Sequence, residues 1–273
     1  MNIFYFFRPK PKLFVAFDEG QGEPTIFIHG IASDSSCWDL VRQVLKEVNG
    51  RRAIGLDLLG FGNSPKPKSS MYSLEDHAKA IERTIKKMKL NGPCTIVGHS
   101  LGGLVAIQLA SRQKLNIKQL FVCAPPIYLN EDLKLSVSKY ERTTRAKNNV
   151  YFSLYKAIAR RPNMSLKAAR LIANRFSDFY LSEATWVPFK RSLTNSINDQ
   201  STFNELANLN LKVTIIYGRL DVFLVPIHYK QAAELNKNIQ LTTFNGGHTL
   251  SKKFSQVVVE ELTTSFRKKP KHL

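Results

Sequence analysis

The sequence is poor in cysteine and has no residue spacing typical of a metal site. Its three cysteines, at positions 37, 94 and 123, are an odd number, and neither C-x-x-C nor H-E-x-x-H occurs in the 273 residues. A zinc mechanism therefore has no support, and we expect no metal. Cys94 and Cys123 fall on expected core strands, where a free thiol behaves as a small apolar group. This use of cysteine favours a reduced, cytoplasmic protein.

Long apolar runs are also missing. The chain begins MNIFYFF, which is too short to span a membrane, because a spanning helix needs about 20 apolar residues. It has no preceding positive region and no small-residue cleavage site, so we do not expect a signal peptide. Because Arg8, Lys10 and Lys12 follow, two interpretations stay open. The segment either packs on the core as an edge strand or makes weak peripheral contact with an anionic membrane.

Acidic residues are scarce relative to basic ones. The chain has 21 Asp and Glu against 40 Lys and Arg, a formal net charge of +19. Such an excess is compatible with nucleic acid, an anionic membrane or an anionic substrate as partner. The basic residues are spread over all segments, however, and no nucleic-acid-binding motif accompanies them. We therefore expect a lysine-rich solvated surface and no nucleic-acid partner.

What the sequence does contain is an alternation of strand-like runs and amphipathic segments, which is typical of an α/β protein. The strand-like runs lie at 13–17, 25–28, 52–56, 95–97, 117–122, 213–217 and 239–244. From 126 to 203 the pattern becomes mostly helical and polar. We expect an α/β core of residues 1–125 and 204–273, with a helical cap inserted at 126–203. The aromatic residues of the cap are candidates for an apolar acyl pocket: Tyr151, Phe152, Tyr155, Phe176, Phe179, Tyr180, Trp186 and Phe189.

The segment 95–106 carries the strongest chemical signal. It reads TIVGHSLGGLVA, a β-branched run followed by the motif G-x-S-x-G and an apolar helical pattern. Strand, sharp turn and helix in this order hold a serine in a strained conformation above a sheet. Gly98 and Gly102 suit such a turn because they have no Cβ atom that could collide with neighbouring backbone. Ser100 is the expected nucleophile, and Gly98, His99 and Gly102 support the motif.

On the residues of this turn, the sequence resembles the α/β-hydrolase family. Three further segments agree with the resemblance: His29-Gly30-Ile31 after a strand, DLLGFGNS at 57–64, and Gly247-His248 near the C-terminus. Together they cover residues 12–265, apart from the middle segment. The resemblance implies a mostly parallel sheet of the eight-stranded type, helices on both faces and no cofactor. It also implies that Asp57 shapes its loop rather than taking part in catalysis.

The resemblance implies a catalytic triad in the chain order Ser, Asp or Glu, His. Asp221 lies just beyond the run at 213–217, where the family commonly carries its acid. Among six histidines, His248 alone follows Ser100 and Asp221 on a loop after the last strand. The others are set aside because of their positions: His29 in the loop after the second strand, His77 and His228 on helices, His99 facing away from the serine on the elbow, and His272 in the tail.

The family also stabilises an oxyanion with backbone N–H groups. On this sequence those donors map onto Ile31, which follows His29-Gly30, and onto Leu101, which follows the serine. Both are backbone groups, so the apolar side chains at these positions are compatible with the role. We therefore expect Ile31 and Leu101 to form the oxyanion hole, with His29 and Gly30 supporting the motif.

These residues predict a serine hydrolase that acts on a small-molecule ester. We expect it to cleave carboxylic esters of small to medium lipophilic substrates through an acyl-enzyme. A carbon–carbon bond hydrolase or a cofactor-free haloperoxidase-like member of the same fold shares the triad and stays open as an alternative. A non-catalytic binding protein is a further alternative. Serine at position 100 argues against epoxide hydrolases and haloalkane dehalogenases, which use a carboxylate nucleophile.

Overall fold

The computed structural model describes residues 11–48, 50–129, 166–167 and 181–267. Its centre is a sheet in the order β1-β3-β2-β4-β5-β6-β7. β1 runs antiparallel to β3, and the other neighbours are parallel. The strands are β1 (Val15–Gly20), β2 (Glu23–Ile28), β3 (Arg51–Leu56), β4 (Cys94–His99), β5 (Ile117–Cys123), β6 (Lys212–Gly218) and β7 (Ile239–Phe244). The mostly parallel α/β prediction is confirmed, with seven strands in the described residues where the resemblance implied the eight-stranded type.

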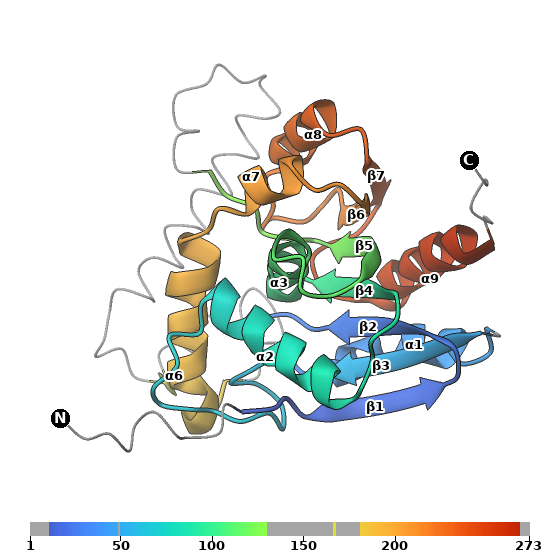
Figure 1. Ribbon diagram of the computed structural model, residues 1–273. Coiled ribbons are helices and arrows are strands. Elements are labelled where there is room, and N and C mark those ends of the chain that lie inside the picture. Colours follow the sequence, from blue (N-terminus) through green and yellow to red (C-terminus); the bar gives the residue numbers. More distant parts are fainter. Residues whose placement is uncertain (1–10, 49, 130–165, 168–180, 268–273) are drawn as a thin grey trace.

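Helices cover both faces of this sheet (Figure 1). On one side α2, α3, α7 and α8 contact one another in that order, and on the other α1 packs against α9. The helical elements are η2 (Ser35–Trp38), α1 (Asp39–Leu45), α2 (Leu74–Lys87), α3 (Leu101–Ser111), α6 (Glu183–Ser192), the π-helix η4 (Leu193–Asn198), α7 (Thr202–Ala207), α8 (Pro226–Leu235) and α9 (Lys252–Arg267).

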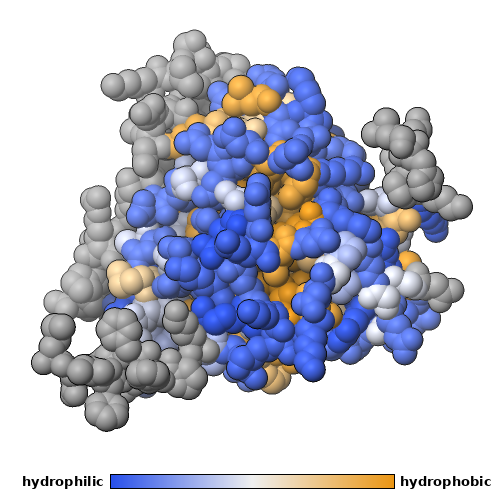
Figure 2. Space-filling model, in the orientation of Figure 1, coloured by the Kyte–Doolittle hydropathy of each residue, from blue (hydrophilic) through white to orange (hydrophobic). Residues whose placement is uncertain are grey.

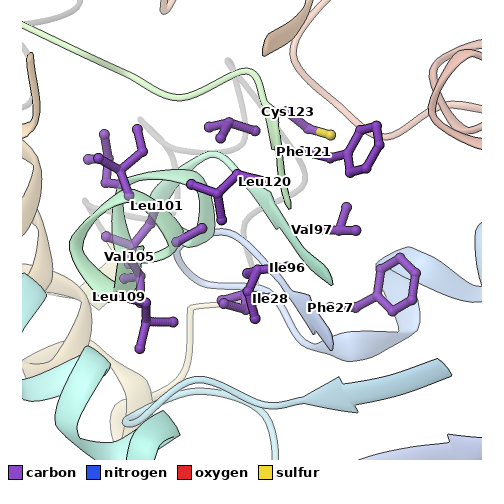
Figure 3. Close-up of a cluster of buried hydrophobic side chains, with 14 of the residues drawn as sticks. Phe27, Ile28, Ile96, Val97, Leu101, Val105, Leu109, Leu120, Phe121 and Cys123 are labelled. Carbon is purple, nitrogen blue, oxygen red and sulfur yellow. The ribbon is translucent and has the colours of Figure 1, made fainter. Parts of the chain in front are cut away.

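The central strands are buried on both faces. Because successive side chains of a strand point to opposite faces, neighbouring residues of β2, β4 and β5 separate into two apolar layers. Figure 3 shows one layer on the side of α3 and the other away from it: Ile28, Ile96 and Leu120 in the first, Phe27, Val97 and Phe121 in the second. All six are inaccessible to solvent, and burying such a side chain contributes about 1.5–3 kcal/mol. The strand that precedes Ser100 is therefore buried along its whole length.

The first strand runs further than the sequence predicts. The prediction ended it at Phe17, because the acidic and glycine-rich residues that follow are typical of a turn. In the structure β1 continues to Gly20, with Asp18 paired to Ile54 of β3. The Asp18 carboxylate accepts two hydrogen bonds from the Arg52 guanidinium, each 2.6 Å long. Cross-strand pairing thus outweighs the local turn preference.

The cap prediction is only partly covered by the described residues. The helices expected between 130 and 180 fall on residues outside them, so the boundaries 126–203 stay a prediction. The described end of this segment, α6 and η4, packs on the core. Ser196 Oγ donates to the carbonyl oxygen of Tyr72 at 2.8 Å, and Arg191 donates to the carbonyl oxygens of Lys68 and Ser70 at 2.6 and 2.5 Å.

The face seen in Figure 2 is mostly polar, as the charged composition predicts. Apolar residues show along its centre, where α3 lies in Figure 1. None of the helices that the structure describes has both the length and the apolar character needed to span a bilayer.

Candidate active site

Ser100 lies at the turn between β4 and α3, as the motif predicts. Its backbone has φ +53° and ψ −120°, which a residue with a side chain rarely adopts. A methyl group on Gly98 would overlap the carbonyl oxygen of Gly102, and one on Gly102 would overlap the backbone of residues 28–29. The N–H of Ser100 donates to the carbonyl oxygen of Cys123 at 2.8 Å. The strained turn is thus held by close backbone packing on both sides.

The imidazole of His248 bridges Asp221 and Ser100. Its Nδ1 lies 2.7 Å from Asp221 Oδ2, and its Nε2 lies 3.0 Å from Ser100 Oγ. Asp221 follows β6 and His248 follows β7, and the ends of parallel strands meet at one edge of the sheet. The structure therefore brings together three residues that stand 27 and 148 positions apart in the chain.

The hydrogen bonds define which nitrogen of His248 carries the proton. An ionised carboxylate only accepts, so Nδ1–H donates to Asp221 and the lone pair of Nε2 faces the Ser100 hydroxyl. The Asp221 side chain is 0 % exposed, and its Oδ1 accepts from the N–H of Phe223 at 2.9 Å. These two hydrogen bonds compensate for the loss of solvent around the carboxylate. The tautomer is the one in which Nε2 can accept a proton from serine.

The loop that carries Asp221 is fastened to the segment after β5. The Tyr128 hydroxyl donates to the carbonyl oxygen of Phe223 at 2.6 Å, and the Tyr229 hydroxyl donates to that of Pro125 at 2.5 Å. Burial, and next the charge of Asp221, raise the pKa of both tyrosines, so both hydroxyls remain donors at neutral pH. Sequence reasoning missed both tyrosines, because no motif or spacing links them to the acid.

His29 shapes the loop after β2. Its Nε2 accepts from the N–H of Leu58 at 2.8 Å, and its Nδ1–H donates to the carbonyl oxygen of Gly30 at 2.7 Å. Burial lowers the pKa of His29, which keeps the ring neutral and suits this pair of bonds. A Cβ atom on Gly30 would lie 3.1 Å from the Cβ of Ser100. The loop therefore passes directly beside the expected nucleophile.

The two residues predicted to donate to the oxyanion come from different segments: Ile31 from the loop beside Ser100, and Leu101 from the position after Ser100 in the chain. Ile31 directly follows Gly30 in the loop just described and is 4 % exposed. Leu101 is the first residue of α3, and the first N–H groups of a helix have no acceptor within it. The N-terminus of α3 also carries a partial positive charge, which favours an anion there.

Asp57, the other carboxylate at a strand end, joins its own loop to the start of η2. Its Oδ1 accepts from the N–H and the hydroxyl of Ser35 at 2.9 and 2.7 Å, and its Oδ2 accepts from the N–H of Asn63 at 2.8 Å. A side chain with both oxygens engaged in this way shapes the loop, as the resemblance implied.

His99 contacts the site through His248. Sequence reasoning set it aside because it faces away from Ser100. In the structure its Nε2–H donates to the carbonyl oxygen of His248 at 2.8 Å, and the two ring centroids are 5.1 Å apart. Adjacent residues in the chain, 99 and 100, thus both bind residue 248, which the sequence could not show.

Two of the cap aromatics are described. Trp186 stacks on Phe189 with ring centroids 5.9 Å apart, and Lys190 Nζ lies 5.1 Å from the centroid of the Trp186 ring. Phe189 is 1 % exposed and belongs to the core. The other six candidates for an acyl pocket lie outside the described residues.

A separate groove lies at the opposite edge of the sheet. Its volume is about 570 Å³, and its walls come from the end of α3, the start of β5 and α7, including Leu115, Asn116 and Asn208. It contains none of the predicted site residues. Within the described ranges, no three His, Cys, Asp or Glu side chains are grouped so that they could hold a metal ion.

The fold and this site define a class of protein: an α/β protein with a serine on a strand–turn–helix elbow, oriented toward an imidazole that a buried carboxylate holds. A family model for the alpha/beta hydrolase fold matches residues 23–252. The chain belongs to this family.

Similar proteins agree with this assignment. The chain is 38 % identical over 106 residues to the probable lysophospholipase BODYGUARD 4 of Arabidopsis thaliana, a match that covers 39 % of this chain and 25 % of the relative. The chain thus spans about a quarter of that relative's length. It is 21 % identical over 241 residues to Lipase 3 of a Moraxella species, covering 85 % of this chain and 73 % of the lipase. The structure of an esterase from Exiguobacterium antarcticum superposes with a TM-score of 0.69 at 19 % identity, covering 94 % of this chain and 96 % of the esterase, which shows a common fold.

Proposed function

We propose that this protein is a serine hydrolase that cleaves carboxylic esters of small to medium lipophilic substrates. The observation that carries the proposal is the hydrogen-bonded line from Asp221 through His248 to Ser100, with distances of 2.7 and 3.0 Å. This is the arrangement of a general base placed to activate a nucleophile and oriented by a third group.

In the first half of the reaction, Ser100 Oγ attacks the carbonyl carbon of the ester while His248 Nε2 takes the hydroxyl proton. Asp221 holds the imidazole in its tautomer and stabilises the imidazolium that forms. The negative charge on the former carbonyl oxygen is bound by the N–H groups of Ile31 and Leu101. Loss of one such donor typically costs about 100-fold or more in turnover. His248 then protonates the leaving alcohol, and an acyl-enzyme remains on Ser100.

In the second half, water takes the place of the alcohol. His248 Nε2 accepts a proton from the water as it attacks the acyl carbon, and the second tetrahedral intermediate uses the same oxyanion donors. Collapse of this intermediate returns the proton to Ser100 Oγ and releases the carboxylic acid. Every proton transferred passes through His248, so the mechanism uses no second acid or base.

Several of the similar proteins support the choice of esters. The names of the matched relatives are those of a probable lysophospholipase and a lipase, and the superposed structure is that of an esterase. All three names denote hydrolysis of a carboxylic ester, and two of them a lipid substrate. A long-chain monoacyl lipid therefore belongs among the substrates to be tested.

A fluorophosphonate probe tests the enzyme class directly. It labels a serine only where a neighbouring base makes the oxygen nucleophilic, so wild type should be labelled and Ser100→Ala should not. Labelling that persists in folded Ser100→Ala, or its absence in folded wild type, would contradict the proposal.

A panel of p-nitrophenyl esters of increasing chain length, together with a lysophospholipid, tests the substrate class. We expect turnover of at least part of the panel. A labelled protein that is inactive on every ester would point to the carbon–carbon bond hydrolase or haloperoxidase-like alternative.

A further inference from the structure

The catalytic histidine of the proposed mechanism lies on a surface loop. His248 stands in the segment 245–251 between β7 and α9, and all of these residues are exposed or half-buried. A Cβ atom on Gly247 would meet nothing within 4 Å. The loop is tied down before the histidine, where Leu220 N–H donates to the carbonyl oxygen of Gly246 at 3.0 Å, and after it, where α9 begins. A contact with the peptide of His248 itself would therefore restrict the position of the imidazole.

His99 makes that contact. We propose that His99 is a positioning residue: its Nε2–H donates to the His248 carbonyl oxygen, 2.8 Å away, and so holds the base in line with Ser100. The inference rests on the proposed function, since it concerns the same site. Residue 248 is then bound at two points by consecutive residues, at its backbone by His99 and at its side chain by Ser100.

The surroundings of His99 make it a firm anchor. It is the last residue of β4, which is buried along its whole length. Its ring packs edge-on against Trp38 and Phe254, with centroids 6.4 and 6.0 Å away. A side chain confined in this way has little freedom left to lose when it binds the loop. The hydrogen bond therefore holds the peptide of His248 at a fixed position relative to the central sheet.

The bond needs a proton on Nε2 of His99, and the neutral ring can supply it. A carbonyl oxygen only accepts, so Nε2 must carry the proton and Nδ1 does not need one. Burial first, and the neighbouring His248 second, lower the pKa of His99 to about 3. A neutral ring also places no positive charge beside His248 when that residue becomes an imidazolium during turnover.

The bond from His99 also persists through the step in which Ser100 is acylated. At that stage Ser100 Oγ is an ester oxygen with no proton to donate, so its hydrogen bond to His248 is lost. The contacts from His99 and Asp221 remain, and they keep the imidazole in place to activate the attacking water. We therefore expect the bond to support turnover rather than substrate binding.

Two substitutions and one control test this inference. His99→Leu removes the donor, whereas His99→Gln keeps an N–H donor three bonds beyond Cβ, as in histidine. Trp38→Phe weakens the packing around His99 and leaves its hydrogen bond intact. Each folded protein is compared with wild type for kcat and KM on a p-nitrophenyl ester, and for the rate of fluorophosphonate labelling.

We expect His99→Leu to lower kcat and the labelling rate about tenfold or more, with KM changed by less than about threefold, because the half-buried carbonyl of His248 loses the donor that holds it. His99→Gln should retain most of the kcat, and Trp38→Phe, which loosens the packing around His99 but keeps the donor, should lower kcat less than His99→Leu does. A proton NMR spectrum gives an independent signature: the downfield His248 Nδ1–H signal should broaden in His99→Leu and stay sharp in His99→Gln.

Other outcomes separate the two proposals. If His99→Leu is as active as wild type, or if His99→Gln and His99→Leu are impaired alike, the positioning role is wrong while the proposed function stands. If folded wild type is neither labelled nor active, the proposed function itself fails. The NMR comparison of the two variants then still tests whether the hydrogen bond from His99 holds His248 in place.

Discussion

Lowering the pH from 7 to 5 should destabilise the folded protein, because His77 is held in the core as a neutral imidazole. The side chain lies on α2, is 0 % exposed, and has its Nε2 3.2 Å from the hydroxyl of Ser192 at the end of α6. Burial lowers the pKa of His77 from 6.5 to about 4, and the nearby carboxylate of Asp76 opposes this shift only in part. Between these two values the unfolded chain binds a proton that the folded chain does not. The stability is therefore complete above pH 6.5 and falls as the pH drops through this window.

The magnitude follows from the two pKa values. At pH 5 the imidazole of the unfolded chain is almost fully protonated and that of folded His77 is mostly neutral, which costs about 2 kcal/mol relative to pH 7. His99, with a pKa of about 3, adds a second contribution of about 2 kcal/mol. Together these are a substantial part of the roughly 5–15 kcal/mol by which a typical domain is stable.

Urea unfolding at pH 7 and pH 5, followed by circular dichroism, measures this loss. His77→Gln removes the titrating group and keeps an amide that can bind Ser192, so its loss on acidification should be smaller by about 2 kcal/mol. Ser192→Ala is the matched control: it should lower stability at both pH values and leave the difference between them as in wild type. A His77→Gln protein that loses as much stability as wild type would refute the reasoning.

Two further predictions concern the geometry of the site. Asp221→Asn should lower kcat about a thousandfold or more at neutral pH, because an amide can donate to Nδ1 of His248 and favour the wrong tautomer; an ester assay that finds near-normal kcat contradicts this. Gly98→Ala should reduce the free energy of unfolding by about 3 kcal/mol or more, because the added methyl overlaps backbone atoms of Gly102. Gly92→Ala, where nothing lies within 4 Å of the added atom, is the control, and equal denaturation midpoints for the two variants would argue against the steric explanation.

Much of the elbow could be predicted from the sequence because its physical requirements are local. A strained residue between a strand and a helix needs small neighbours, and Gly98 and Gly102 stand within two positions of Ser100. The prediction for the end of β1 was wrong because residues distant in the chain determine it. β1 extends to Gly20 because it pairs with β3, and no window around Asp18 contains the partner Arg52.

By itself, the sequence determined the α/β class and the nucleophile, and with the family resemblance it selected Asp221 and His248 as partners of Ser100. Only the tertiary structure decided the contacts of these residues. The hydrogen bond from His99 to residue 248 and that from Tyr128 to the loop of Asp221 join segments 149 and 95 residues apart. Such contacts depend on how the ends of parallel strands converge at one sheet edge, and side chains and loops that meet there share no local pattern in the chain.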